Sequence, residues 1–218
     1  MRDSTQEVAA ARTRPWLIAS GAALGWGLLT IAVLHIVSSR NPALDTLSSY
    51  AFTDRGTGLL AASILALAVG SLFVLAALRA AGVPITRTTG ILFGTWSGGL
   101  TLAAVFPASY AEFPDPVSGE IHQYACLVAF LSLPAIGFAL LDSLRETPAL
   151  AHLRRTLTGW TLLSAGTLAL FGVSYLLAGP LPVGVTQRLA LLADLALLHS
   201  LLVLAGRAAT VAREPATP

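Results

Sequence analysis

The sequence predicts an all-α, polytopic integral membrane protein, built as a bundle of six transmembrane helices, and three observations support this. Hydrophobic residues make up 55% of the 218 residues, and the mean hydropathy is +0.75. Charged residues make up only 11%, well below the share in soluble domains, whose surfaces must be largely polar. The apolar residues also form long segments, which a lipid bilayer solvates and water does not.

Six apolar segments each approach the ~20 residues that a helix needs to cross a hydrocarbon core of ~30 Å. We expect helices at residues 16–38, 58–80, 90–106, 121–143, 157–177 and 185–209, the third being the shortest. Polar tails at 1–15 and 210–218 flank a single membrane domain at 16–209. The first segment is too long for the core of a signal peptide, so we expect it to be a retained helix.

The placement of arginine predicts how the helices are oriented in a cell membrane. All 13 basic residues are arginine. Ten of them fall on the side of the two termini, and three, Arg40, Arg55 and Arg188, fall on the other side. Because cytoplasmic loops are enriched in basic residues, both termini are predicted to be cytoplasmic. The net charge of +2 is small and dispersed, so no nucleic-acid partner is expected.

Glycines recur at four-residue spacing on two of the predicted helices. Gly90, Gly94 and Gly98 form a smooth stripe on the third helix, and Gly21 and Gly25 repeat the pattern on the first. Such stripes admit a neighbouring backbone closely. We expect tight packing inside one bundle with the third helix at its centre; the alternative is a homodimer through these glycine-rich faces.

Polar residues gather in the predicted outer loop between the first two helices. Asn41 before a proline is a favourable helix start, which predicts a short helix lying in the membrane interface. Asp45, Ser48, Ser49 and Tyr50 follow it and are, with Asn41, candidate ligand-binding residues. The alternative interpretation is a solvated face on which Tyr50 is an interfacial anchor.

Three further candidate ligand-binding residues, His122, Gln187 and Arg188, fall at predicted helix starts on the same side. We expect Ser118 to cap the fourth helix, which places His122 in the first turn, where the helix dipole favours a neutral imidazole. A neutral imidazole suits a general base, a metal ligand or an ordinary hydrogen bond. Arg188 suits the phosphate of a lipid or a pairing with an outer carboxylate such as Asp45.

The remaining signals for chemistry are weaker. His35, near the outer end of the first helix, is expected to approach His122, and with Asp45 the two histidines form a dispersed set of metal candidates. The sequence contains no P-loop, no nucleophile elbow and no His-Glu-x-x-His motif, and it leaves any cofactor unidentified. The single cysteine, Cys126, excludes an internal disulfide and is expected to be a packing residue.

Asp194 is predicted near the bilayer midplane, about nine residues into the sixth helix. A carboxylate at this depth costs ~2.5–3.5 kcal/mol on insertion scales, so it should face the bundle or a wet cavity. We expect a hydrogen bond to a neighbour such as Thr95, Trp96 or Ser97. The alternative is a proton or cation site.

The order of these motifs resembles that of a known family. Asn-Pro-x-x-Asp-x-x-Ser-x-Tyr begins at Asn41, Phe-Pro at Phe106, Gly-x-x-His at Gly119 and Gly-x-x-Gln-Arg at Gly184. Over residues 16–209 the chain resembles the bacterial and archaeal membrane family catalogued as domain of unknown function 998. Members often carry an aspartate soon after Phe-Pro, and here Asp115 is the available substitute. The resemblance implies a six-helix bundle and supplies no activity.

Three functions are compatible with these residues. The first is a protein that interacts with membrane lipids and binds a lipid or lipid-like ligand through an outer-face polar site of Asp45, His122 and Arg188. The second is an intramembrane enzyme on a lipid-like substrate, with His122, Asp45 or Asp194 as the catalytic candidates for acid–base or metal chemistry. The third is a small transporter that uses Asp194.

Overall fold

The computed structural model describes residues 4–53, 58–177 and 181–211. The regular elements in these ranges are six α-helices and two short 3₁₀-helices. In chain order they are α1 (Ser4–Val37), η1 (Leu47–Phe52), α2 (Leu59–Ala80), α3 (Arg87–Val105), α4 (Pro116–Ser143), η2 (Pro148–Leu150), α5 (Ala151–Leu176) and α6 (Val183–Ala208). The expectation of an all-helical chain is therefore confirmed.

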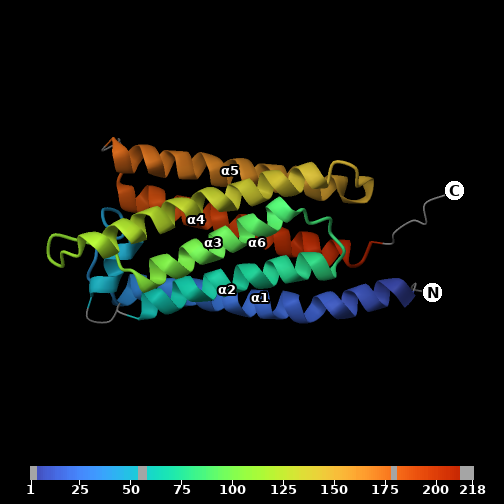
Figure 1. Cartoon of the computed structure of the whole chain (residues 1–218), viewed down its shortest axis with the longest axis horizontal. Coiled ribbons are helices and arrows are strands. Elements are labelled where there is room, and N and C mark those ends of the chain that lie inside the picture. The colour runs from blue at the N-terminus through green and yellow to red at the C-terminus, as the bar shows by residue number, and fades with distance from the viewer. Residues whose placement is uncertain (1–3, 54–57, 178–180, 212–218) are drawn as a thin grey trace.

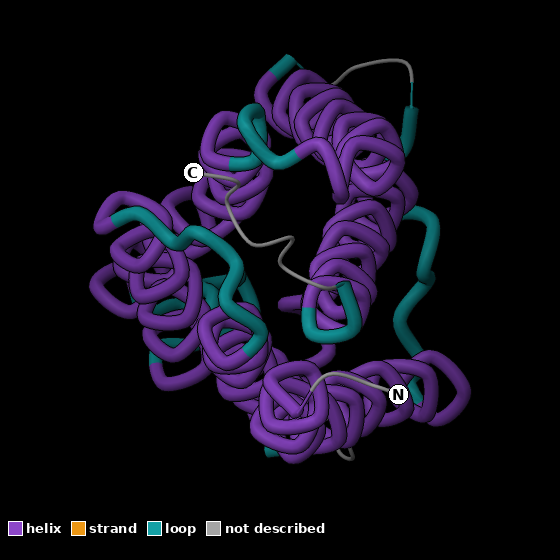
Figure 2. The backbone as a smooth tube through the Cα atoms, turned by 90° about the vertical axis from the view of Figure 1, so that its right-hand side faces the viewer, coloured by secondary structure: helices purple, strands orange, loops and turns teal. Residues whose placement is uncertain are grey.

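Successive α-helices alternate in direction along one bundle axis (Figure 1). Each helix packs against the next in the chain, and α6 packs against α1, α2, α4 and α5; Figure 2 shows the helices end-on, side by side around the axis. The start of α1 and the end of α6 lie at one end of the bundle, which is called the end of the termini below (Figure 1). The opposite end, called the loop end below, carries η1, the segment 106–115 and the start of α6.

The helix boundaries agree with the predicted segments to within six residues, α4 and α5 beginning five and six residues early, with one larger exception. The first helix begins at Ser4 and continues through Pro15, whereas the polar residues 1–15 were expected to be a tail outside the helix. Local propensity explains the difference, because residues 4–15 are rich in alanine and arginine, both strong helix formers.

Five of the α-helices are long and apolar enough to cross a membrane, by length and composition alone: α1, α2, α4, α5 and α6. The remaining helix, α3, has 19 residues and is rich in threonine and glycine, which lowers its hydropathy. It lies between α2 and α4 and runs from the end of the termini to the loop end (Figure 1).

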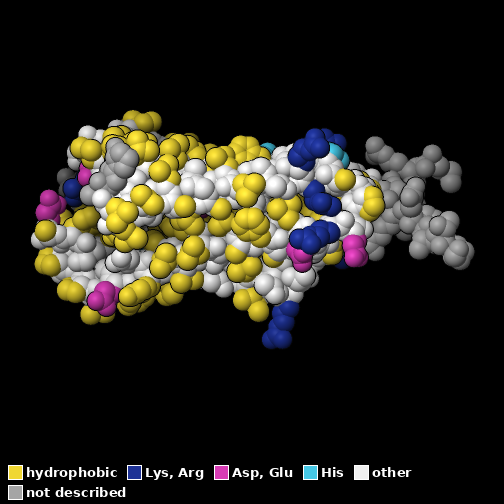
Figure 3. Space-filling model, turned by 90° about the horizontal axis from the view of Figure 1, so that it is seen from above, with side chains coloured by type: hydrophobic (Ala, Val, Ile, Leu, Met, Phe, Trp, Pro, Cys, Tyr) yellow, Lys and Arg dark blue, Asp and Glu magenta, His cyan; other side chains and the backbone are white. Residues whose placement is uncertain are grey.

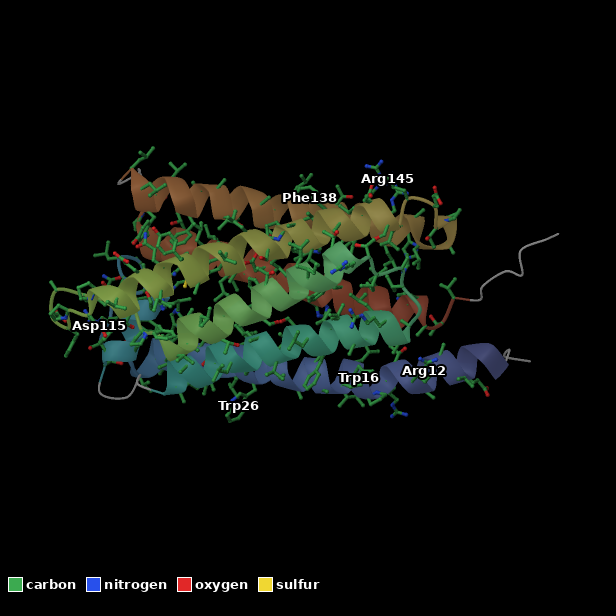
Figure 4. All side chains as sticks on the ribbon, viewed as in Figure 1. Arg12, Trp16, Trp26, Asp115, Phe138 and Arg145 are labelled. Carbon is green, nitrogen blue, oxygen red and sulfur yellow. The ribbon has the colours of Figure 1, made fainter. Side chains whose placement is uncertain are left out.

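The outside of the bundle is apolar, as expected of helices solvated by lipid. Apolar side chains cover the middle of the face seen in Figure 3, and charged groups gather towards its two ends. Trp26 and Phe138 point outward between the ends, while Arg12 and Arg145 lie towards the end of the termini (Figure 4). The interior is packed around large buried side chains such as Phe93, Trp96, Leu133, Leu197 and Leu201.

The glycine stripes do not pack inside the bundle, and the sequence-based expectation on this point is wrong. A Cβ added at Gly94 or Gly98 would meet no atom within 4 Å, and both residues are exposed. Gly99, beside the stripe, is the close contact: an added Cβ would lie 2.8 Å from the Ala125 carbonyl oxygen of α4. Gly21 and Gly25 of α1 are open and exposed in the same way.

The periodicity therefore marks an outer face of α3 at Gly94 and Gly98, whereas Gly90 lies beside Arg79 of α2, whose Nη2 an added Cβ would approach to 3.0 Å. Gly94 and Gly98 contact no other helix among the described residues, and a homodimer through them stays a prediction.

These glycines give a matched pair of substitutions. Gly99→Leu should destabilise the protein by about 1–3 kcal/mol, because the side chain would have to displace the α4 backbone. Gly94→Leu should leave the melting temperature in detergent unchanged or slightly raised, since it fills open space and improves helix propensity. Equal losses of stability in the two variants would show that the exposed stripe is packed after all.

Candidate functional site

Arg188, one turn into α6, is the centre of a hydrogen-bond cluster at the loop end. Its Nε donates to His35 Nε2 at 2.7 Å, and its Nη2 donates to the Tyr50 hydroxyl at 2.7 Å. Its Nη1 donates to the main-chain oxygens of Asp45 and Gly184, both at 2.9 Å. The guanidinium also lies over the Tyr50 ring, 5.5 Å from the centroid. Arg188 thus ties α1, the 41–50 segment and α6 together.

His35 holds one tautomer because of its two partners. Its Nδ1 lies 2.7 Å from the Ile31 carbonyl oxygen, which only accepts, so Nδ1 carries a proton. Its Nε2 faces the Arg188 Nε–H, which only donates, so Nε2 presents its lone pair. The imidazole is therefore neutral, and it faces Arg188; it does not approach His122 as the sequence suggested.

A second set of contacts docks the start of α6 on the segment that precedes η1. Gln187 Oε1 accepts from the Leu47 N–H at 2.6 Å, and the Val185 N–H donates to the Ala43 carbonyl at 3.2 Å. A Cβ added at Gly184 would lie 2.6 Å from the Asp45 carbonyl oxygen. Only glycine permits this close approach. We call these contacts and those of Arg188 the α6 junction.

The pairing suggested by the sequence between the Asp45 carboxylate and Arg188 is absent among the described residues. Its Oδ2 accepts from the Asn41 N–H at 2.8 Å, while Asn41 Oδ1 accepts from the Ala43 N–H at 2.9 Å. Together with the Asp45 N–H, which donates to the Asn41 carbonyl oxygen at 2.8 Å, these bonds close a tight turn in which the Asn41 side chain accepts from the backbone two residues on, as in an Asx-turn. Asp45 therefore turns its carbonyl to Arg188 and its carboxylate to the opposite side. The short helix itself begins only at Leu47 and is a 3₁₀-helix.

The carboxylate side of this turn lines a polar pocket of about 410 Å³. Asn41 and Asp45 form part of it, together with Arg40 and Glu112, whose side chains form an ion pair at 3.3 Å. The pocket continues to Phe52 and Thr53 at the end of η1. It lies at the loop end, where Figure 4 also shows Asp115.

A larger, mainly apolar cavity of about 510 Å³ lies next to it. Its walls come from η1, α2, the end of α3, the 107–113 segment and α4. Ser48, Thr53 and His122 are its polar side chains. Phe52 and Thr53 line both this cavity and the polar pocket. The two spaces therefore adjoin at η1.

His122 joins the end of α3 to α4 in the wall of the apolar cavity. Its Nδ1 lies 3.0 Å from the Ala103 oxygen and 2.9 Å from the Phe106 oxygen, so Nδ1 carries the proton. Its Nε2 lies 3.5 Å from Cys126 Sγ. α4 begins earlier than expected. Asp115, not Ser118, is its N-cap, and Pro116 occupies its first turn. His122 is therefore in the second turn.

The other candidates of η1 divide between the cavity and the core. The Ser48 hydroxyl lines the cavity and lies 2.9 Å from the Tyr110 hydroxyl. Ser49 is buried and donates to the Thr46 carbonyl oxygen. Tyr50 is fully buried, so the alternative interpretation of this residue as an interfacial anchor is wrong. It is held by Arg188, with His35 edge-on at 5.2 Å between centroids.

Asp194 lines neither space; it lies within the bundle and is 2% exposed. Its Oδ1 accepts from Ser164 of α5 at 2.6 Å, whereas we had expected a partner on α3. Its Oδ2 has no partner among the residues that the structure describes. The Ser164 hydroxyl thus satisfies one oxygen of the carboxylate, so the expectation that a neighbouring side chain satisfies Asp194 holds for Oδ1 and not for Oδ2.

The structure does not bring all the candidate site residues together. His122 and Asp45 line adjoining spaces, and Arg188 lines neither. In the described ranges, no three His, Cys, Asp or Glu side chains are grouped so as to hold a metal ion, and the set of His35, Asp45 and His122 is dispersed.

Sequence reasoning missed Arg40, Glu112 and Phe52 as site residues. Arg40 was noted only as one of the three basic residues on the arginine-poor side, although it directly precedes Asn41. The acidic Glu112 could have been found, because its loop contains no arginine and the oppositely charged Arg40 lies in another loop on the same side. An ion pair between these two loops was therefore predictable.

The fold and this end of the bundle define an all-helical protein with several helices that could span a membrane. The chain belongs to the family described as "Protein of unknown function (DUF998)", whose model matches residues 18–204. The resemblance noted from the motifs is thereby confirmed. No curated protein and no solved structure matches the chain.

The α6 junction gives a stability prediction. Arg188→Lys should lower the free energy of unfolding by about 2–3 kcal/mol, because lysine lacks the planar fork that reaches several acceptors, and each hydrogen bond to a charged group contributes about 1.5–3 kcal/mol. Arg145→Lys is the control, since its ion pair with Asp142 is largely exposed and should contribute little. Thermal melts in detergent measure both, and an Arg188→Lys variant as stable as wild type would contradict the role of the junction.

Proposed function

We propose that the protein is a six-span membrane protein, with both termini in the cytoplasm, that binds an amphiphilic, lipid-like molecule at the loop end. The observation that carries the proposal is the adjoining pair of spaces, one polar and one apolar, that share Phe52 and Thr53. Each has the size of ordinary ligand sites, which are about 300–1,000 Å³. A molecule with a polar head and an apolar chain matches this division.

The direction of α3 supports six spans. It connects the end of α2 to the start of α4 at opposite ends of the bundle (Figure 1). If α2 and α4 cross the membrane, α3 must cross as well, despite its lower hydropathy. Its position between two apolar helices lowers the cost of its polar residues, because Thr89 and Ser97 are buried among neighbours. The excess of arginine at the end of the termini supports the orientation.

Reporter fusions test this topology. Alkaline phosphatase fused after Asp115 should be active, because the loop end is external, and a fusion at the C-terminus should be inactive. A green fluorescent protein at the C-terminus should fluoresce. Phosphatase activity at the C-terminus, or none after Asp115, would contradict the orientation or the six-span count.

The candidate residues take two kinds of role in this proposal. Asn41 and Asp45 face the head of the ligand in the polar pocket, while Ser48 and His122 face its chain in the apolar cavity. The remaining candidates do not face the ligand and instead fix the shape of η1 through hydrogen bonds. They are Ser49, Tyr50, Gln187 and Arg188. Arg188 thus becomes a positioning residue, because four of its five N–H donors are already used inside the protein.

A cavity-filling substitution tests ligand binding. Ala61 of α2 lines the apolar cavity, whereas its neighbour Ala62 is exposed on the outside. Ala61→Trp should strongly reduce retention of phospholipid after purification in detergent, because the indole would occupy the space of the chain. Ala62→Trp should retain as much phospholipid as wild type, as measured by mass spectrometry of the extracted lipid. Equal retention in both variants, with both folded, would count against the cavity as a ligand site.

An enzyme on a lipid-like substrate is the second candidate, and one observation favours it. Because the Nδ1 of His122 is held by two carbonyl oxygens, Nε2 is the nitrogen left to act as a general base in the wall of the cavity. Chemical change of phospholipids incubated with the wild type, and its loss in His122→Ala, would select this function. A transporter that uses Asp194 is a further alternative, favoured by the unpartnered Oδ2 of that buried side chain.

A further inference from the structure

The polar pocket carries charges of both signs. Arg40 supplies one positive charge, and Asp45 and Glu112 supply two negative charges. The three formal charges sum to −1 around a space of about 410 Å³. An anionic head group would be repelled by this sum, whereas a group that carries both an ammonium and a phosphate finds a partner for each.

The ion pair in the pocket is loosely held. Arg40 Nη2 and Glu112 Oε2 are 3.3 Å apart, with side chains 25% and 67% exposed. Exposed ion pairs of this kind contribute little to stability, so the partners can be exchanged for those of a ligand. An arginine fork is suited to a phosphate, with which it forms two parallel hydrogen bonds.

The carboxylate of Asp45 is fixed in place. The Asn41 N–H holds its Oδ2, and the Arg188 Nη1 holds its main-chain oxygen from the other side. Among the described residues its Oδ1 has no hydrogen-bond partner, and the side chain lines the pocket. A fixed carboxylate oxygen and a second, exposed carboxylate, Glu112, in the lining of the same pocket are suitable acceptors for an ammonium group.

We propose that the polar pocket selects a zwitterionic head group with a phosphate and a primary amine. The phosphate binds Arg40, the ammonium binds Asp45 and Glu112, and the chain passes Phe52 into the apolar cavity. At this point Phe52 stacks on Phe113, with 5.1 Å between the ring centroids. This inference rests on the proposed amphiphile site and names the class of its ligand.

The test compares two lipids that differ only in the head group. The purified full chain is given equal amounts of dioleoyl phosphatidylethanolamine and dioleoyl phosphatidylglycerol in detergent, and bound lipid is counted by native mass spectrometry. We expect about a tenfold preference for the ethanolamine lipid. Asp45→Asn and Glu112→Gln should each remove the preference, whereas Glu120→Gln should keep it, since Glu120 is an exposed acid of α4 outside the pocket lining.

The outcomes separate the two proposals. If both lipids bind equally, if the glycerol lipid binds better, or if both pocket variants keep the preference, the head-group inference fails while the amphiphile site stands. If neither lipid binds the folded protein, the proposed function itself fails. Using two pocket variants keeps the test valid if Asp45→Asn disturbs the turn at Asn41.

Discussion

The rest of the loop end depends on the hydrogen bonds of Arg188. A half-buried guanidinium is stable only where its donors are satisfied, and here a neutral histidine, a tyrosine hydroxyl and two main-chain oxygens accept them. No acidic side chain pairs with it among the described residues. The positive charge thus serves to fix three segments of chain, which gives η1 a defined position over the bundle.

This arrangement explains why two short motifs distant in the sequence occur in one chain. The motif from Asn41 to Tyr50 supplies acceptors to Arg188 and a backbone N–H to Gln187, while the motif from Gly184 to Arg188 also provides the space for close approach. With its inner side held in this way, η1 turns Ser48, Phe52 and the following Thr53 towards the adjoining spaces. The structure of the motifs is thereby linked to the proposed binding of an amphiphile.

The helices were largely predictable from the sequence, because apolar length and arginine placement follow directly from the physics of a bilayer. The partners of Arg188 were not predictable, since every residue has a main-chain oxygen and the sequence does not indicate which of them accept a hydrogen bond. The Asp45 carboxylate, suggested as the partner, does not pair with Arg188 among the described residues. The spacing of Gly90, Gly94 and Gly98 showed that they share a face but not what the face contacts. Likewise, the sequence predicted that Asp194 faces the inside of the bundle, whereas its partner Ser164 depended on which helix lies beside α6.

The central claim is that the junction holds open a divided site for an amphiphile, and direct observation of that site tests it most directly. Cryo-electron microscopy of the protein in nanodiscs of native lipid extract should show continuous density, with its head beside Arg40 and Asp45 and its chain running past Phe52 towards His122. An ordered loop end with only water in the polar pocket, and with the apolar cavity closed by side chains, would contradict the account.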